Sequence, residues 1–283
     1  MKQTYYIPLT ATPWKQTESY REIPPASPAL AGIIRCFWGS VKPYEKKEAQ
    51  TCTTVVIPDT CVDIIYQINY TENTITSKFC GINDSCFTVY ESEKPGHLIS
   101  VFGIRFYAWA ACIFSEDSLK DTVNGCYDIQ SRFRWLDKQL RQQLFEKCSL
   151  KERSRITEEH LLKKMATPRH CGVIESAVGQ ILLQNGALST GHLARECFIS
   201  SRHLERLFHE YIGITPKKLS SLVRYQCLWN ELVRAPSFSM LDAVYKYGYT
   251  DQSHLMREFK RYHTMSIQDA LVYAWDLPLT AHN

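Results

Sequence analysis

A six-residue pattern of the form HLxRxF occurs twice in the last third of the sequence. It reads HLERLF from residue 203 and HLMREF from residue 254, so matching residues lie 51 positions apart. At helical spacing the apolar residues of each copy share one face, and polar side chains occupy the opposite face. These polar residues are Ser201, Arg202, Glu205 and Arg206 in the first copy, and Gln252, Ser253, His254 and Arg257 in the second. Such side chains on a helix in the major groove hydrogen-bond base edges and phosphates, so we predict that they bind double-stranded DNA.

Two simpler interpretations of these helix faces compete with DNA binding. The polar face of a single amphipathic helix is usually just hydrated. Arg202 with Glu205, or Arg206 with Glu210, could also form ion pairs along one helix, because they are three or four residues apart. Repetition of the whole pattern favours DNA binding, and the ion pairs can coexist with it.

Each copy is predicted to be the second helix of a helix-turn-helix unit. Residues that would cap a helix or turn the chain are Ser189, Ser200 and Gly213 in the first unit, and Ser239, Asp242, Gly248 and Thr250 in the second. Between the units, Thr215 and Pro216 begin a helix that continues to about Arg234. About 19 residues give a length of about 28 Å, close to one turn of B-DNA. This linker helix could therefore place the two second helices in successive major grooves.

From about Val173 to Leu271 the sequence resembles the AraC/XylS family of transcription regulators. The resemblance rests on the unit LARECFISSRHLERLFHEYIGITPKKL, on Arg224, and on the unit AVYKYGYTDQSHLMREFKRYH. It implies a sequence-specific DNA-binding regulator that is not an enzyme. In it, bases are read by Arg202, Glu205 and Arg206 of the first unit and by Gln252, Ser253, His254 and Arg257 of the second. It also allows RNA polymerase and a second copy of the chain as partners.

Two features depart from the family pattern. The second unit closes with HTMSI, which has Thr264 and Ile267 where a glycine and a Ser-Pro step are usual. The linker helix carries Leu228 and Trp229 near positions where a small residue is expected. We therefore expect the second unit to bind DNA with less base reading than the first.

The first half of the sequence is predicted to form short strands. Residues 30–125 are rich in β-branched and aromatic residues and are divided by turn pairs such as Pro58-Asp59 and Pro95-Gly96. They fit the cupin-like sensor half of many AraC-type proteins, and IPDTCVDIIY and GIRFYAWA resemble landmarks of an uncharacterised domain often joined to this DNA-binding half. The predicted fold is a two-domain α+β chain. It combines a mostly β, cupin-like barrel with an all-α pair of helix-turn-helix units.

The predicted domains are a sensor and dimerisation domain at 1–150, a basic linker at 151–171 and a DNA-binding domain at 172–283. Residues 130–148 read as a helix with a stripe formed by Phe133, Leu136, Leu140, Leu144 and Cys148. This stripe either packs on its own domain or, by family analogy, pairs with its copy in a homodimer.

A barrel of this kind can enclose a small effector. The candidate contacts are Tyr66, His97, Arg105 and Trp109. Aromatic residues on strands more often belong to the core. Arg105 lies in an apolar strand, so it needs either an anionic ligand or a carboxylate partner, which Asp59 or Asp63 could supply.

Charge and cysteine content limit which functions and cellular locations the sequence supports. The net charge is only +4, and residues 172–283 hold 11 basic against 10 acidic residues, so DNA binding cannot be argued from bulk charge. The 11 cysteines form no CxxC pair. The sequence shows no export signal and no apolar run long enough to span a membrane. We therefore expect reduced thiols, no metal or cofactor, and a cytoplasmic protein.

Two other functional classes require clusters of residues that this sequence does not show. A cupin-type metalloenzyme needs a histidine cluster, whereas His97 is the only histidine before His160. A cysteine-based DNA repair or redox-sensing regulator needs a clustered thiolate site, whereas these cysteines are scattered.

Overall fold

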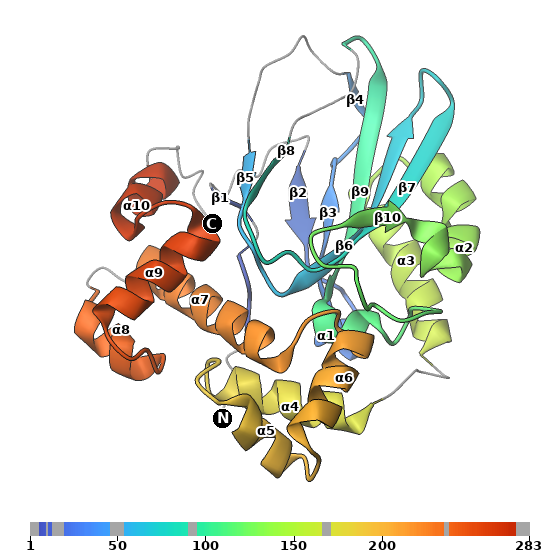
Figure 1. The fold of residues 1–283 in the computed structure, drawn as a ribbon. Coiled ribbons are helices and arrows are strands. Elements are labelled where there is room, and N and C mark those ends of the chain that lie inside the picture. Colours follow the sequence, from blue (N-terminus) through green and yellow to red (C-terminus); the bar gives the residue numbers. More distant parts are fainter. Residues whose placement is uncertain are drawn as a thin grey trace.

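The computed structural model describes residues 6–9, 11–12, 20–45, 54–89, 95–165, 171–234 and 238–275. The N-terminal part is an antiparallel β-sheet unit with its own helices, and the C-terminal part is wholly helical (Figure 1). The two units pack together, and one cluster of buried apolar side chains extends through both. The predicted two-domain α+β architecture is confirmed.

Seven strands form the main sheet, in the order β10-β7-β6-β9-β3-β2 with β4 also paired to β9. They are β2 (Arg21–Ile23), β3 (Ile34–Gly39), β4 (Tyr44–Glu45), β6 (Cys61–Asn69), β7 (Thr74–Cys80), β9 (Leu98–Tyr107) and β10 (Cys126–Asp128). A smaller sheet has the order β1-β5-β8, from β1 (Ala11–Thr12), β5 (Thr54–Val56) and β8 (Phe87–Val89). Within the described ranges no strand pairs from one sheet to the other, so the predicted cupin-like barrel is not confirmed.

The main sheet has one buried face and one partly exposed face. Along β6, Ile64, Tyr66 and Ile68 are fully buried, whereas Ile65 and Gln67 between them are partly exposed. The buried face lies under α2 (Arg134–Glu146) and α3 (Leu150–Lys164) (Figure 1). Short helical turns complete the unit: η1 (Pro28–Leu30), α1 (Ala108–Ala111) and η2 (Ile129–Ser131).

The apolar stripe predicted for residues 130–148 packs on its own domain. Phe133, Leu136, Leu140 and Leu144 have no exposed surface, and the ring of Phe133 lies 5.1 Å from that of Phe79 on β7. Cys148, the last residue of the predicted stripe, is exposed. The buried part of this stripe is therefore not available for pairing with a second copy.

Most of the described part of the predicted linker 151–171 is helical and packs on the N-terminal unit. Arg153 of α3 is completely buried, and its guanidinium donates to Ser100 Oγ at 2.6 Å and to the Tyr70 hydroxyl at 2.7 Å. Glu158 accepts hydrogen bonds from two amides of the loop before η1. Residues 166–170 lie outside the described residues.

The C-terminal helices follow the predicted pattern of two helix-turn-helix units joined by one long helix. They are α4 (Gly172–Leu183), α5 (Thr190–Glu196), α6 (Ser201–Tyr211), α7 (Pro216–Arg234), α8 (Met240–Lys246), α9 (Gln252–His263) and α10 (Ile267–Trp275). Ser189, Ser200 and Ser239 cap α5, α6 and α8 as predicted, each accepting a backbone hydrogen bond. The prediction for Thr250 was wrong. Asp251 caps α9 instead, because the helix begins one residue later and this carboxylate reaches the His254 amide at 2.7 Å.

The expectation that all cysteines are reduced was also wrong. Cys80 ends β7 and Cys126 begins β10, and these antiparallel strands place the two residues opposite each other. Their Cα atoms are 4.1 Å apart and their sulfurs form a disulfide. The two residues are 46 positions apart in sequence, so only the pairing of these strands brings them together.

Neither a metal site nor a membrane helix is found in the described part of the chain. No group of three or more His, Cys, Asp or Glu residues is placed there to hold a metal ion. None of its helices is long and apolar enough to cross a membrane.

Candidate nucleic-acid interface

The helices α6 and α9, the second helices of the two units, are called the recognition helices below. In α6, Leu204, Leu207 and Phe208 are buried against the rest of the unit. The four predicted DNA-contacting residues, Ser201, Arg202, Glu205 and Arg206, are all exposed on the opposite side. The first recognition helix therefore presents to solvent the polar face that the sequence predicts.

Arg206 lies in a local polar network on α6. Its guanidinium is 3.6 Å from the Glu210 carboxylate and 3.1 Å from His203 Nε2. The Arg206–Glu210 ion pair is one of the two that helical spacing suggested. Exposed pairs of this kind contribute at most about 1 kcal/mol, so Arg206 can exchange them for a base or a phosphate.

The second recognition helix, α9, also has an exposed polar face. Gln252, Ser253 and Arg257 are exposed, as predicted. His254 is only half exposed, since its ring packs edge-on against Tyr249 and its Nδ1 accepts a hydrogen bond from the Thr250 amide at 3.3 Å. Like Arg206, His254 is thus held by contacts within its own unit.

A largely buried ion pair fixes α9 to the linker helix α7. Arg224 donates to both carboxylate oxygens of Glu258 at 2.9 Å, and Ser221 donates to the same carboxylate. The Arg224 guanidinium also lies 4.6 Å from the Tyr249 ring centroid. Burial alone would raise the pKa of Glu258, but the hydrogen bonds and charge of Arg224 hold this pKa below its ordinary value.

An aromatic cluster reinforces the contact between α7 and α9. The His263 ring stacks 4.9 Å from Phe259 and lies 4.5 Å from the Trp229 ring. Its Nδ1 is 2.8 Å from the Tyr225 hydroxyl. Burial lowers the pKa of His263 to about 4, so the imidazole is neutral at neutral pH.

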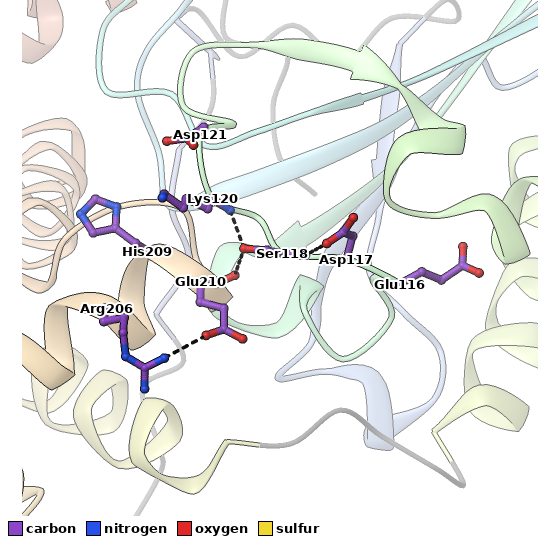
Figure 2. Close-up of a pocket in the computed structure, with 8 residues that line it drawn as sticks. All are labelled: Glu116, Asp117, Ser118, Lys120, Asp121, Arg206, His209 and Glu210. Carbon is purple, nitrogen blue, oxygen red and sulfur yellow. Dashed lines mark hydrogen bonds and ion pairs between the residues drawn. The ribbon is translucent and has the colours of Figure 1, made fainter.

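The N-terminal unit touches the first recognition helix directly. The loop after α1 binds the last turn of α6, where the Leu119 amide and Ser118 Oγ both donate to the Glu210 carbonyl, at 2.9 and 3.1 Å. Gly213, with φ of +93°, lets the loop approach, because a Cβ there would lie 2.8 Å from the Leu119 carbonyl oxygen. An open groove between loop and helix is lined by Glu116, Asp117, Ser118, Lys120, Asp121, Arg206, His209 and Glu210 (Figure 2).

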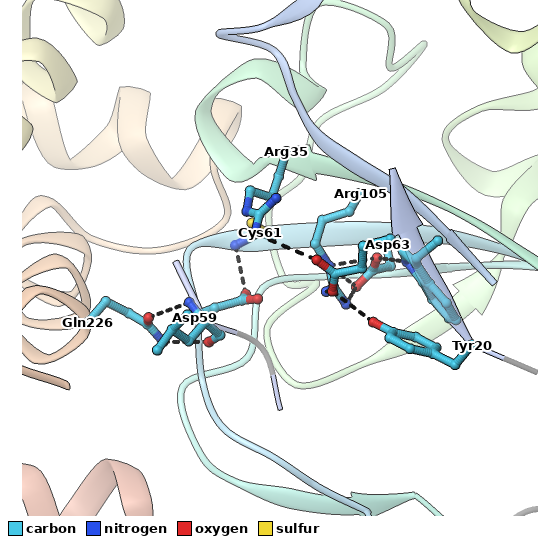
Figure 3. Close-up of polar contacts among 10 residues, drawn as sticks. Tyr20, Arg35, Asp59, Cys61, Asp63, Arg105 and Gln226 are labelled. Atoms are coloured by element: carbon cyan, nitrogen blue, oxygen red, sulfur yellow. Dashed lines mark hydrogen bonds and ion pairs between the residues drawn. The ribbon is translucent and has the colours of Figure 1, made fainter. Parts of the chain in front are cut away.

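The N-terminal unit also binds the middle of the linker helix. The Gln226 amide is buried; its Nε2 donates to the carbonyls of Leu9 and Pro58, and its Oε1 accepts from the Leu9 amide at 2.7 Å (Figure 3). Asp59, beside this contact, is buried, and its carboxylate accepts from the Cys61 amide. Burial raises the pKa of Asp59 to about 6, against the opposing effect of the Arg105 charge.

Arg105 has carboxylate partners within the chain. It donates to both oxygens of Asp63 across the β6–β9 pair, at 2.9 to 3.3 Å, and its Nη1 lies 3.8 Å from Glu22 (Figure 3). Asp63 also accepts from the Trp38 indole at 2.7 Å. The structure therefore contains the Asp63 pairing that could satisfy Arg105 without a ligand.

The other candidate effector residues do not gather around Arg105. Tyr66 is on the opposite face of the sheet, because it is three residues from Asp63 on β6. His97 lies just before β9 and bonds Asn69. Trp109, expected on a strand, lies on α1 and stacks on Tyr107 at 4.9 Å.

Sequence reasoning missed Glu258 and Gln226 as positioning residues. Glu258 did leave a signal, because it occupies the repeat position that holds the buried Leu207 in the first unit. A carboxylate at a core position requires a partner, which Arg224 provides. Gln226 left no such signal, since its partners are 168 and 217 residues away.

Comparisons with known proteins agree with this geometry. Residues 193–271 match a family described as a helix-turn-helix domain, and residues 21–128 match a domain of unknown function (DUF6597). No curated protein matches the chain.

Solved structures with similarity to this chain include two bacterial proteins. An AraC-type transcriptional regulator from Chromobacterium violaceum is 20% identical, with 38% of this chain and 96% of that chain covered and a TM-score of 0.34. ToxT from Vibrio cholerae O395 is 11% identical, with 92% and 100% covered and a TM-score of 0.42. Because the matched helix-turn-helix region spans both recognition helices and the helix between them, we conclude that the C-terminal part of the chain is a helix-turn-helix domain of the AraC type.

Proposed function

We propose that the chain regulates transcription by reading a specific DNA sequence with both recognition helices, and that a small effector in the N-terminal unit controls this binding. The observation that carries the proposal is that both recognition helices expose polar faces while α7 joins their units. With 19 residues, α7 is about 28 Å long, close to one turn of B-DNA. The two faces therefore suit successive major grooves.

The exposed side chains suit base reading. Arg202, Arg206 and Arg257 can each donate two hydrogen bonds to the O6 and N7 atoms of guanine, and Gln252 can bond adenine in the same manner. Glu205 can accept from the amino group of cytosine. The fixed position of α9 against α7, through Arg224 and Glu258, supports a defined spacing between the two sets of contacts.

Effector control is supported by the contacts between the units. Gln226 of α7 binds the carbonyl of Pro58, the residue next to Asp59, and the charge of Asp59 interacts with that of Arg105. A ligand that changed the Arg105–Asp63 pairing would therefore act close to the contact that holds α7. Among the four candidate effector residues, Arg105 is the one adjoining this route.

Selection of binding sites from random duplexes by the full chain tests the proposal. We expect an enriched motif with two blocks whose centres lie about 10 base pairs apart. The double variant Arg206→Ala/Arg257→Ala should lose this enrichment. Arg155→Ala, which removes an exposed arginine from α3, should keep it. If the full chain enriches no sequence at low salt, the proposed function is wrong.

The effector part has its own test. Thermal unfolding of the full chain is measured against a panel of small metabolites, and any stabilising compound is added to the DNA-binding assay. We expect the compound to change DNA affinity in the wild type and to change it less in Gln226→Met, which lacks the carbonyl contacts. A stabilising compound that leaves wild-type DNA affinity unchanged would argue against effector control.

A further inference from the structure

Phe198 occupies the turn between α5 and α6 in an unusual way. Its φ is +54°, in the left-handed region, and its side chain is 95% exposed. The turn is closed by hydrogen bonds from the Phe198 amide to the Arg195 carbonyl and from the Ile199 amide to the Ala194 carbonyl, both 3.0 Å long. The backbone thus requires a left-handed residue at this position, and the chain places a bulky aromatic residue there.

The second unit shows what the turn itself needs. Gly248 occupies the same place between α8 and α9, with φ of +68°. Its amide donates to the Tyr245 carbonyl, and the Tyr249 amide donates to the Val244 carbonyl, which repeats the bonding of the first unit. Glycine adopts this conformation without steric cost, whereas phenylalanine does not.

Folding gains nothing that would offset this strain at Phe198. The ring buries almost no surface, whereas the next residue, Ile199, is partly buried against the core cluster. Strained, non-glycine residues persist mainly at positions used for binding or catalysis. The aromatic side chain therefore points to a contact made outside the chain.

The position of the turn indicates what that contact is. Phe198 lies two residues before Ser200, which caps α6, and three residues before Ser201, which is followed by Arg202, both of them exposed. In helix-turn-helix proteins this N-terminal end of the recognition helix meets the base edges. The apolar group that DNA offers in the major groove is the C5-methyl of thymine, and phenylalanine is one of the residues that contact it.

We propose that Phe198 is a specificity-determining residue that packs on a thymine methyl at the edge of the DNA site read by α6. This inference rests on the proposed function, because it requires α6 to enter the major groove. It adds an apolar contact to the hydrogen-bonding residues of the polar face. It also assigns this apolar contact to the first unit alone, since Gly248 at the same place in the second unit presents no side chain.

The test uses the full chain and the sequence that the wild type selects from random duplexes. In Phe198→Gly the strain is removed, so the thermal midpoint should rise while affinity for the selected duplex falls at least about fourfold, the effect of one buried methyl group. Replacing the contacted thymine by deoxyuridine, which lacks the methyl, should lower wild-type affinity by a similar factor and leave the variant's affinity unchanged. Opposite changes in stability and affinity separate a DNA contact from a folding defect.

Asn185→Gly is the matched control, since Asn185 is also left-handed, with φ of +49°, and lies in the turn after α4. This variant should bind the selected duplex as the wild type does. If Phe198→Gly binds the selected duplex as tightly as the wild type does, the inference is overturned. The same holds if only reporter transcription falls, a result that would imply a protein partner instead. Equal affinity of the wild type for thymine and deoxyuridine at every position of the site also overturns it. Failure of the wild type to select any sequence would instead refute the proposed function.

Discussion

The amide of Leu119 donates to the carbonyl of Glu210 at 2.9 Å and so joins a loop of the N-terminal unit to the last turn of α6. This contact brings Glu116, Asp117 and Asp121 to the groove that also contains Arg206 (Figure 2). A phosphate approaching Arg206 along this groove would meet the three carboxylates of the loop, the Glu210 carboxylate and one lysine, Lys120. Charges at this range are not fully screened at low salt, so the loop should oppose DNA binding by α6.

Neutralising the three carboxylates should strengthen DNA binding. The triple variant Glu116→Gln/Asp117→Asn/Asp121→Asn keeps side-chain shape and removes the repulsion. If each charge contributes about 0.5 kcal/mol at roughly 9 Å in water, the full chain should bind DNA about tenfold more tightly at low salt. The gain should shrink as salt is raised, which titration of DNA affinity against ionic strength measures.

A second triple variant controls for net charge. Glu45→Gln/Glu72→Gln/Glu146→Gln removes the same charge from β4, from the turn between β6 and β7, and from the end of α2. These positions lie away from the C-terminal helices (Figure 1). An equal rise in affinity for both variants would mean that overall charge, and not the loop beside α6, sets the effect.

The C-terminal unit was largely predictable because its sequence repeats. The repeated pattern fixed the faces of α6 and α9, and Ser189, Ser200 and Ser239 cap helices as local chemistry predicts. The N-cap of α9 was predicted one residue too early, at Thr250. Both Thr250 and Asp251 are residue types that cap helices, and only the geometry selects Asp251.

The N-terminal unit was less predictable because its chemistry depends on strand pairing. Composition indicates strands, but it does not reveal that Asp63 faces Arg105 or that Cys80 faces Cys126. The four effector candidates were chosen by residue type, and side-chain alternation then places Tyr66 on the opposite face from Arg105. Contacts between the units, such as Leu119 with Glu210, join residues far apart in sequence and leave no local pattern.

Arg105→Ala should destabilise the full chain. The variant leaves the largely buried Asp63 carboxylate without its bidentate partner, and breaking such a pair costs roughly 3 kcal/mol. Thermal unfolding should show a lowered midpoint. The double variant Arg105→Met/Asp63→Leu removes both charges and should be more stable than Arg105→Ala. If Arg105→Ala melts as the wild type does, the pair is not structural and Arg105 is free to serve an effector.

The buried His263 should make stability depend on pH. Its folded pKa of about 4 is below the ordinary value of 6.5, so between these values the unfolded chain binds a proton that the folded chain does not. The free energy of unfolding should therefore fall as the pH drops below 6.5, with a contribution of about 2 kcal/mol lost at pH 5. The stability advantage of wild type over His263→Gln should be smaller by this amount at pH 5 than at pH 7.5, as urea unfolding followed by tryptophan fluorescence can measure. An equal pH dependence in wild type and His263→Gln would contradict the assignment.

Arg206 and Arg257 occupy equivalent positions of the two recognition helices, and their alanine variants should differ in effect. Arg206→Ala should cost about 1 to 3 kcal/mol of binding free energy and remove the preference for guanine at one position, because the first unit matches the family pattern closely. Arg257→Ala should weaken binding evenly across sequences and lower the salt slope by about one, as loss of a phosphate contact does. The reason for the difference is the closing turn of the second unit, where Thr264 takes φ of +63° without the freedom of glycine. Site selection and salt titration with each full-length variant measure both quantities. Loss of base preference at two positions one helical turn apart would show that α9 reads bases as fully as α6, and no effect of either change would exclude both arginines from the DNA interface.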